Sequence, residues 1–119
     1  MTQPSDRGRL LAHNVFFSLH DRSPAARARL VESSRKYLAP HAGVVFFACG
    51  ELAADLRRDV NDLEFDVALH VVFTDQAAHD AYQTTPAHLQ FIAENKSNWK
   101  RVRVFDSVVE QSQSQAQPR

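Results

Sequence analysis

The chain has 119 residues, enough for one hydrophobic core but too few for two independent ones. Its 14 basic and 14 acidic side chains give a formal net charge of zero, which removes the long-range field that draws proteins to phosphate. We therefore expect a single domain without a nucleic-acid partner. No apolar run is long enough to cross a bilayer, so no membrane partner is expected. The lone Cys49 and an amino terminus without an apolar leader favour a cytoplasmic location.

The first half of the chain predicts a strand, a helix and a second strand. Residues 11–19 alternate with the period of a strand, and neighbouring phenylalanines make both of its faces apolar. Ser23 and Pro24 are typical of a helix start, and a buried stripe is expected along that helix until Pro40. Residues 44–50 are rich in β-branched and aromatic side chains and predict the second strand. The expected stripe consists of Leu30, Val31, Ser34, Tyr37 and Leu38.

The second half predicts a strand, an interrupted helix and a last strand. The polar residues 51–64 are expected to form an exposed connection, and residues 65–74 a third strand. Asp75 is expected to cap a helix that buries Ala78, Ala81 and Tyr82 and restarts at Thr85-Pro86. Residues 102–109 predict the final strand.

This order of elements predicts an α+β fold of ferredoxin-like β-α-β-β-α-β topology with an antiparallel sheet. The strands are apolar on both faces, because Phe46 precedes Phe47 and Val104 precedes Phe105. Helices can cover one face only, so we expect a second copy of the chain to cover the other, as in a dimeric α+β barrel. The domain is expected over residues 10–110, between a flexible amino terminus (1–9) and a disordered tail (111–119).

Three side chains are candidates for a site. Tyr82 and His88 flank the helix restart at Pro86, and His13 shares a strand face with Val15. We therefore expect the phenol and the two imidazoles to converge on one cavity between the helices and the sheet. The alternative interpretation is structural: His13 hydrogen-bonds Tyr82 or a backbone group and ties a helix to the sheet.

The other histidines carry less information. His70 lies on the opposite strand face and is placed at the expected dimer interface, whereas solvated positions are expected for His20, His41 and His79. Their spacing matches no metal site, so no metal is expected, and only His41 with the acidic residues of 51–64 is left open. With three glycines there is no phosphate-binding loop, and no cofactor is expected.

Several segments resemble the stress-responsive A/B barrel family over residues 10–110. The most diagnostic segment is Ala81-Tyr82 followed by Pro86-Ala87-His88 and Phe91, because the strands alone would fit many dimeric α+β barrels. The strand segments that carry the resemblance are His13-Asn-Val-Phe-Phe, Phe65-Asp-Val-Ala-Leu-His-Val-Val-Phe73 and Val104-Phe105-Asp106. The resemblance implies a dimer of ferredoxin-like domains.

One member of that family is a plant polyketide cyclase that performs an aldol condensation without metal or cofactor. The resemblance implies that His88 is a general base, that Tyr82 orients it or donates a hydrogen bond to an enolate, and that His13 polarises a carbonyl. The chain departs from the pattern at Thr85, where many members have a histidine, and at Val67, where the cyclase has another.

Three functions therefore compete. The first is a homodimer that binds a small apolar or aromatic carbonyl-type ligand, oriented by the three candidate side chains. The second is a cofactor-free enzyme, a polyketide cyclase-like lyase or an isomerase, that uses the Tyr82 and His88 pair. The third is a structural assembly module without a ligand. A cavity open to the three side chains favours the first two, and sealed, fully hydrogen-bonded side chains favour the third.

Overall fold

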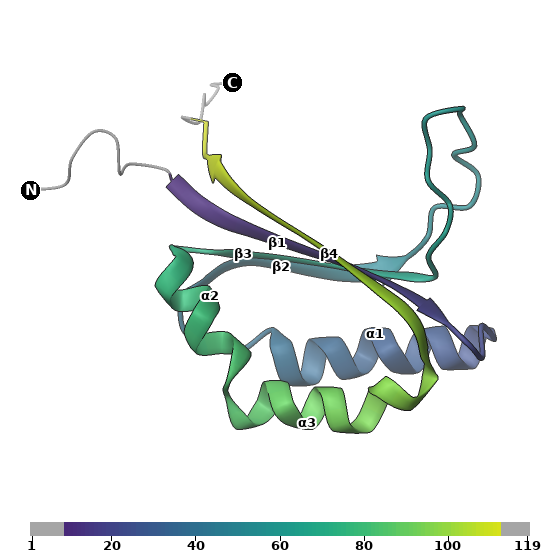
Figure 1. Cartoon of the computed structure of the whole chain (residues 1–119), viewed down its shortest axis with the longest axis horizontal. Helices are drawn as coiled ribbons and strands as arrows, with labels where there is room; N and C mark the ends of the chain where they lie inside the picture. The colour runs from purple at the N-terminus through teal and green to yellow at the C-terminus, as the bar shows by residue number, and fades with distance from the viewer. Residues whose placement is uncertain (1–8, 113–119) are drawn as a thin grey trace, which may run out of the picture.

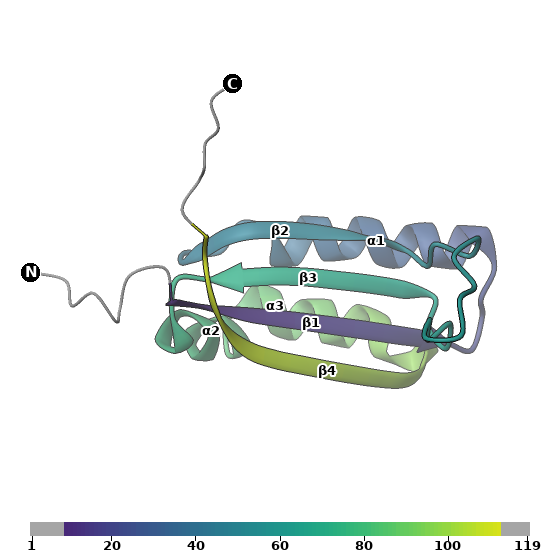
Figure 2. The ribbon, with the colours of Figure 1, turned by 90° about the horizontal axis from the view of Figure 1, so that it is seen from above.

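The computed structural model describes residues 9–112, which form an antiparallel four-stranded sheet with helices on one face (Figure 1). The strands lie in the order β2-β3-β1-β4, so β1 and β3 are central and β4 is an edge (Figure 2). The order of elements confirms the predicted ferredoxin-like topology. The elements are β1 (Arg9–Leu19), α1 (Pro24–Leu38), β2 (Val44–Glu51), β3 (Val67–Phe73), α2 (Gln76–Gln83), α3 (Pro86–Asn95), the 3₁₀ turn η2 (Lys96–Asn98) and β4 (Trp99–Glu110).

The chain ends are only partly visible in this structure. The predicted amino terminus (1–9) and tail (111–119) lie outside the described residues, apart from Arg9, which begins β1, and residues 111–112. The last strand begins at Trp99, three residues earlier than predicted, because the short turn η2 leads directly into pairing with β1. No helix among residues 9–112 has the length and apolarity to span a membrane.

Helix starts follow the predicted capping residues. The Ser23 side chain accepts a hydrogen bond from the Ala26 backbone amide at 3.2 Å, and Pro24 begins α1. Thr85 caps α3 in the same way, by accepting from the His88 amide at 3.2 Å. Pro86 takes the first helical position, where its missing N–H breaks no helical bond. The predicted helix restart is therefore real, and it separates α2 from α3.

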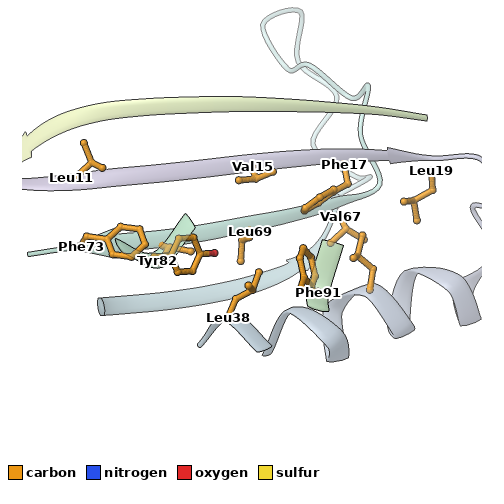
Figure 3. Close-up of a cluster of buried hydrophobic side chains, with 12 residues drawn as sticks. Leu11, Val15, Phe17, Leu19, Leu38, Val67, Leu69, Phe73, Tyr82 and Phe91 are labelled. Carbon is orange, nitrogen blue, oxygen red and sulfur yellow. The ribbon is translucent and has the colours of Figure 1, made fainter. Parts of the chain in front are cut away.

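The hydrophobic core lies between the sheet and the helices (Figure 3). Phe17 of β1 packs against Phe91 of α3 and Trp99 of β4, with ring centres 6.2 Å and 5.0 Å apart. At the other end of the sheet Tyr82 packs against Phe73, with ring centres 4.9 Å apart. In α1 the fully buried positions are Ala26, Leu30, Ser34 and Leu38, while Val31 and Tyr37 of the predicted stripe are half-buried.

The predicted burial of Ala81 is wrong. Ala81 is exposed, whereas Tyr82 is 2 % exposed and Ala78 is half-buried. Ala81 lies about 100° around the helix axis from Tyr82, on a side of α2 that is exposed to solvent.

The face of the sheet away from the helices, called the outer face below, is apolar and open. Phe46 and Phe105 are 55 % and 54 % exposed there. Phe16 packs against Phe65 and Phe105 on the same face, with ring centres 5.0 Å and 5.7 Å apart. The predicted two-sided strands are therefore confirmed, and so is the position of His70, whose Nδ1 lies 2.7 Å from the Asn14 side-chain oxygen on this face.

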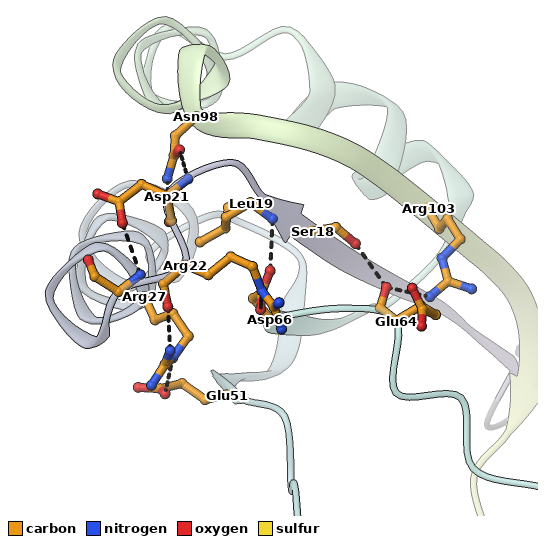
Figure 4. Close-up of polar contacts among 11 residues, drawn as sticks. Ser18, Leu19, Asp21, Arg22, Arg27, Glu51, Glu64, Asp66, Asn98 and Arg103 are labelled. Atoms are coloured by element: carbon orange, nitrogen blue, oxygen red, sulfur yellow. Dashed lines mark hydrogen bonds and ion pairs between the residues drawn. The ribbon is translucent and has the colours of Figure 1, made fainter.

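A buried carboxylate fixes the end of β1 (Figure 4). The Asp66 side chain accepts hydrogen bonds from the Leu19 backbone amide and from the Arg22 guanidinium, both at 2.8 Å. These contacts join the start of β3 to the turn that leads into α1. The preceding connection spans residues 52–66, not the predicted 51–64, because β2 includes Glu51 and β3 begins at Val67 and not at Phe65. It is largely exposed, as predicted, and rises on the outer-face side of the sheet (Figure 1).

Candidate functional site

A pocket of about 160 Å³ lies between the helix-covered face of the sheet and the helix pair α2 and α3, and all three candidate side chains line it. It reaches the edge strand β4, where Val102 and Val104 are 39 % and 48 % exposed. The predicted convergence of the three side chains is therefore observed, although their chemical roles stay a prediction. The lining residues are His13, Val15, Phe17, Leu38, Leu69, Tyr82, Gln83, His88, Phe91, Ile92, Trp99, Val102 and Val104.

Tyr82, near the end of α2, supplies the phenol. Its ring is buried, and its hydroxyl is directed toward the side of Leu69 and Leu38, which also line the pocket (Figure 3). Burial raises the pKa of Tyr82, so the hydroxyl is protonated at neutral pH and can donate a hydrogen bond. In the hydrogen bonds of residues 9–112, Tyr82 takes part through its backbone carbonyl, which accepts from the Thr85 hydroxyl at 3.1 Å, and its own hydroxyl forms none there. The phenol is therefore a free donor on an otherwise apolar wall.

His88 lies in the first turn of α3, on the other side of the helix break. Its ring packs edge-on against Tyr82, with ring centres 4.8 Å apart. Burial lowers the pKa of His88, and the neighbouring imidazoles His13, His41 and His79 lower it further. The neutral ring that results can accept a proton. Its Nδ1 is buried and has no hydrogen-bond partner within the described residues.

His13 is held by a carboxylate from the neighbouring strand. β1 and β4 pair His13 with Asp106, and the His13 Nδ1 lies 2.5 Å from the Asp106 Oδ1. The His13 side chain is 7 % exposed and the Asp106 side chain 42 %. Burial lowers the pKa of His13, and the Asp106 carboxylate opposes that effect. Because the carboxylate accepts from Nδ1, the neutral ring carries its lone pair on Nε2.

Two other histidines lie closer to this site than predicted. The solvated position expected for His79 is wrong: its side chain is 15 % exposed, and its ring centre lies 4.9 Å from that of His13. The His41 ring is half-buried and lies 5.0 Å from the ring of Tyr82. Among the described residues, the group of side chains placed to hold a metal is His13, His79 and Asp106, and not His41 with the acidic loop. His20 is exposed, as predicted.

A larger hollow lies elsewhere among the described residues and has different lining residues. It measures about 400 Å³ and lies where β1 begins, next to the start of α2. Arg9, Thr74, Asp75 and Gln76 are among its lining residues, but no histidine or tyrosine is. The smaller pocket is the better site because it combines apolar walls with convergent acid and base groups.

The fold has counterparts among known proteins. The family model described as "Stress Responsive A/B Barrel Domain" matches residues 11–109. The chain therefore belongs to the stress-responsive A/B barrel domain family, as its strand and Pro-Ala-His segments predicted. A comparison with curated proteins found no matching sequence.

Solved structures show the same fold at low sequence identity. A family member with a ferredoxin-like fold from Mesorhizobium loti is 23 % identical, with a TM-score of 0.69 over 87 % of this chain and 99 % of that one. A dimeric ferredoxin-like protein from Thermobifida fusca is 16 % identical, with a TM-score of 0.71 over 86 % and 92 %. The hydroxynitrile lyase of Passiflora edulis is 17 % identical, with a TM-score of 0.70 over 88 % and 97 %.

Proposed function

We propose that the protein is a homodimer, joined through the outer faces of its sheets, in which each protomer binds a small aromatic carbonyl compound in the site pocket. The carbonyl oxygen accepts a hydrogen bond from Tyr82, and the imidazoles of His13 and His88 contact the same polar end. The observation that carries this proposal is the pair of Tyr82 and His88 in one pocket, where the buried His88 Nδ1 has no hydrogen-bond partner among the described residues.

The outer face supports the dimer. An isolated protomer leaves Phe46 and Phe105 more than half exposed, with Phe16 and Phe65 beside Phe105. Contiguous apolar surface of this kind is typical of a protein interface. Structural neighbours from Thermobifida fusca and Jannaschia are described as dimeric ferredoxin-like proteins, which supports self-association here.

The size of the pocket supports a ligand with one ring. A dry cavity of about 150 Å³ lined by Leu, Ile and Phe accommodates benzene. The site pocket, at about 160 Å³, is similar in size and is lined by Leu38, Leu69 and Phe91. Its polar groups lie together, so a ligand with one polar end and one apolar end fits best.

The second candidate function is proton transfer at a carbon next to the carbonyl. In that reaction neutral His88 removes the α-proton, the electron pair moves onto the carbonyl oxygen, and Tyr82 donates a hydrogen bond to the resulting enolate. Delivery of that proton from His88 to a different carbon of a conjugated enolate completes an isomerisation. Attack of the enolate carbon on a second carbonyl instead forms a carbon–carbon bond, and the resulting alkoxide takes the proton from His88 to give an aldol product. The edge contact between the Tyr82 and His88 rings favours this candidate, because it places a donor beside a base.

Acetophenone tests both functions, because it has one ring, one carbonyl and exchangeable α-protons. Ligand-observed NMR should show saturable binding to the wild-type dimer, and Tyr82→Phe should weaken that binding about 5- to 10-fold, as expected for one hydrogen bond of about 1 kcal/mol. His20→Gln is the matched control, because His20 is exposed and does not line the pocket. Its affinity should equal that of the wild type.

The same sample in D₂O separates binding from catalysis. Loss of the methyl signal faster than in buffer, abolished by His88→Gln, would establish proton transfer. Binding without exchange would support the ligand-binding function alone. If the wild-type dimer does not bind acetophenone, the aromatic carbonyl proposal is overturned and the structural assembly module becomes the better account.

A further inference from the structure

Three metal-binding side chains from three different elements meet beside the site pocket. Pairing of β1 with β4 places His13 opposite Asp106, and α2 places the ring of His79 4.9 Å from that of His13. One possible ligand atom from each residue lies within 4.8 Å of the other two. We propose that His13, His79 and Asp106 bind a divalent transition-metal ion, and that zinc fits them best.

The donor set favours zinc over magnesium or calcium. Two imidazole nitrogens and one carboxylate oxygen are typical zinc ligands, with a fourth position left for water or another ligand. Magnesium and calcium prefer sites made of oxygen alone. Tetrahedral bonds of about 2.1 Å separate ligand atoms by roughly 3.4 Å. The His13 Nδ1 and the Asp106 Oδ1, 2.5 Å apart, must therefore move apart by about 0.9 Å, whereas the widest separation, at most 4.8 Å, must close by up to about 1.4 Å. The Asp106 side chain, which is 42 % exposed, leaves room for this movement and for entry of the ion.

Hydrogen bonds with neighbouring groups fix the tautomer and orientation of the His79 ring. The His79 Nδ1 lies 3.0 Å from the Asp80 carboxylate, and the His79 Nε2 lies 3.2 Å from the amide nitrogen of Gln83. The Nδ1–H therefore donates to Asp80, and the lone pair of Nε2 accepts from Gln83, so zinc takes the place of the Gln83 hydrogen bond at Nε2. A carboxylate behind a histidine is the usual outer partner of a metal ligand, because it fixes the ring and raises its basicity.

The close contact between His13 and Asp106 provides the other two ligand atoms. The His13 Nδ1 and the Asp106 Oδ1 lie 2.5 Å apart and share one proton. An ion replaces that proton once the two atoms move apart to admit it, and the proton moves to the His13 Nε2 or to solvent. His13 also lines the site pocket, so occupancy of the metal site changes the polar end of that pocket. The metal proposal does not depend on the proposed carbonyl ligand.

Zinc titration of the tag-free, chelator-treated full chain tests the proposal. Competition against a chromophoric chelator should give one ion per chain, and bound zinc should raise the melting temperature. His79→Gln and Asp106→Asn should each weaken zinc binding at least about 10-fold, the scale seen when a metal site loses a supporting group. His20→Gln, which changes an exposed histidine, should leave the affinity unchanged.

A second measurement works without any substitution. In wild-type protein, imidazole ¹⁵N resonances of His13 and His79 should shift with the first equivalent of zinc, while those of His20 and His70 stay in place. Absence of zinc binding by the wild type overturns the proposal. Equal zinc affinity of the wild type, His79→Gln and Asp106→Asn also overturns it. So do first-equivalent shifts at other histidines, because either result indicates an adventitious ion only.

Discussion

Replacing Tyr82 by Phe should leave the protein as stable as the wild type. The substitution keeps the buried ring and its contact with Phe73, whose centre lies 4.9 Å away. It removes a hydroxyl that forms no hydrogen bond within the described residues, where Tyr82 accepts only through its backbone carbonyl, so no hydrogen bond of about 1 kcal/mol is lost. We expect the free energy of unfolding to change by less than about 0.5 kcal/mol. Tyr82→Ala, which empties the ring position, should instead cost about 3–5 kcal/mol.

The second tyrosine provides a matched comparison. The Tyr37 hydroxyl donates to the Glu94 carboxylate at 2.7 Å on an exposed surface. Tyr37→Phe should therefore cost about 0.5–1.5 kcal/mol while leaving acetophenone affinity unchanged. Tyr82→Phe should show the reverse: an unchanged free energy of unfolding and weaker acetophenone binding. Urea unfolding measures the stability, with every variant at one protomer concentration because dimerisation adds to apparent stability.

A stability loss of more than about 1 kcal/mol for Tyr82→Phe would refute this reasoning. It would mean that the hydroxyl has a structural partner in the folded dimer. A phenol with such a partner is not free to bind a ligand, and the structural interpretation of Tyr82 would then replace the proposed one.

Three further predictions concern stability and assembly. Asp66→Ala should cost about 2–3 kcal/mol in urea unfolding, chiefly because the buried Leu19 amide loses its acceptor, and Asp66→Asn should cost less. Burial lowers the pKa of His88 in the folded protein below its ordinary value of 6.5. When the pH falls below 6.5, the unfolded state therefore binds a proton that the folded state does not, so the free energy of unfolding should decrease and then level off below the folded pKa. His88→Gln should reduce that fall, and an unchanged pH profile would contradict the assignment. Phe105→Asp should produce monomers in light scattering at micromolar concentration, whereas Val60→Asp, in the exposed loop, should not; a dimeric Phe105→Asp would place the interface elsewhere.

The sequence predicted most of the fold because its signals are local. Alternation along each strand assigned Phe16 and Phe17 to opposite faces, and Thr85-Pro86 marked the break between the two helices. The same local signals placed Tyr82 and His88 on either side of that break. These features depend on residues at most a few positions apart.

The rest of the site depends on pairing between distant segments. Asp106 meets His13 only because β1 and β4 pair in one register, across 93 positions of the chain. The sequence predicts that His79 lies on the exposed surface of a helix. In the structure α2 packs against the end of the sheet, and the ring of His79 contacts that of His13. Neither spacing nor composition fixes the angle between a short helix and a sheet, so this imidazole was missed.

Alternate residues of strand β1 face the site pocket and the apolar outer face of the sheet. His13 faces the pocket, while Asn14 and Phe16 face the opposite way. A slip of one residue in the pairing of β1 would therefore bring Asn14 into the pocket and remove Phe16 from the outer face at once. An insertion or deletion within this strand moves every residue after it to the other face, whereas residues 52–60, which precede Phe65 and Asp66, can change length without altering either surface of the strand. Divergence among proteins built this way should accumulate in that loop, with the length of β1 held constant.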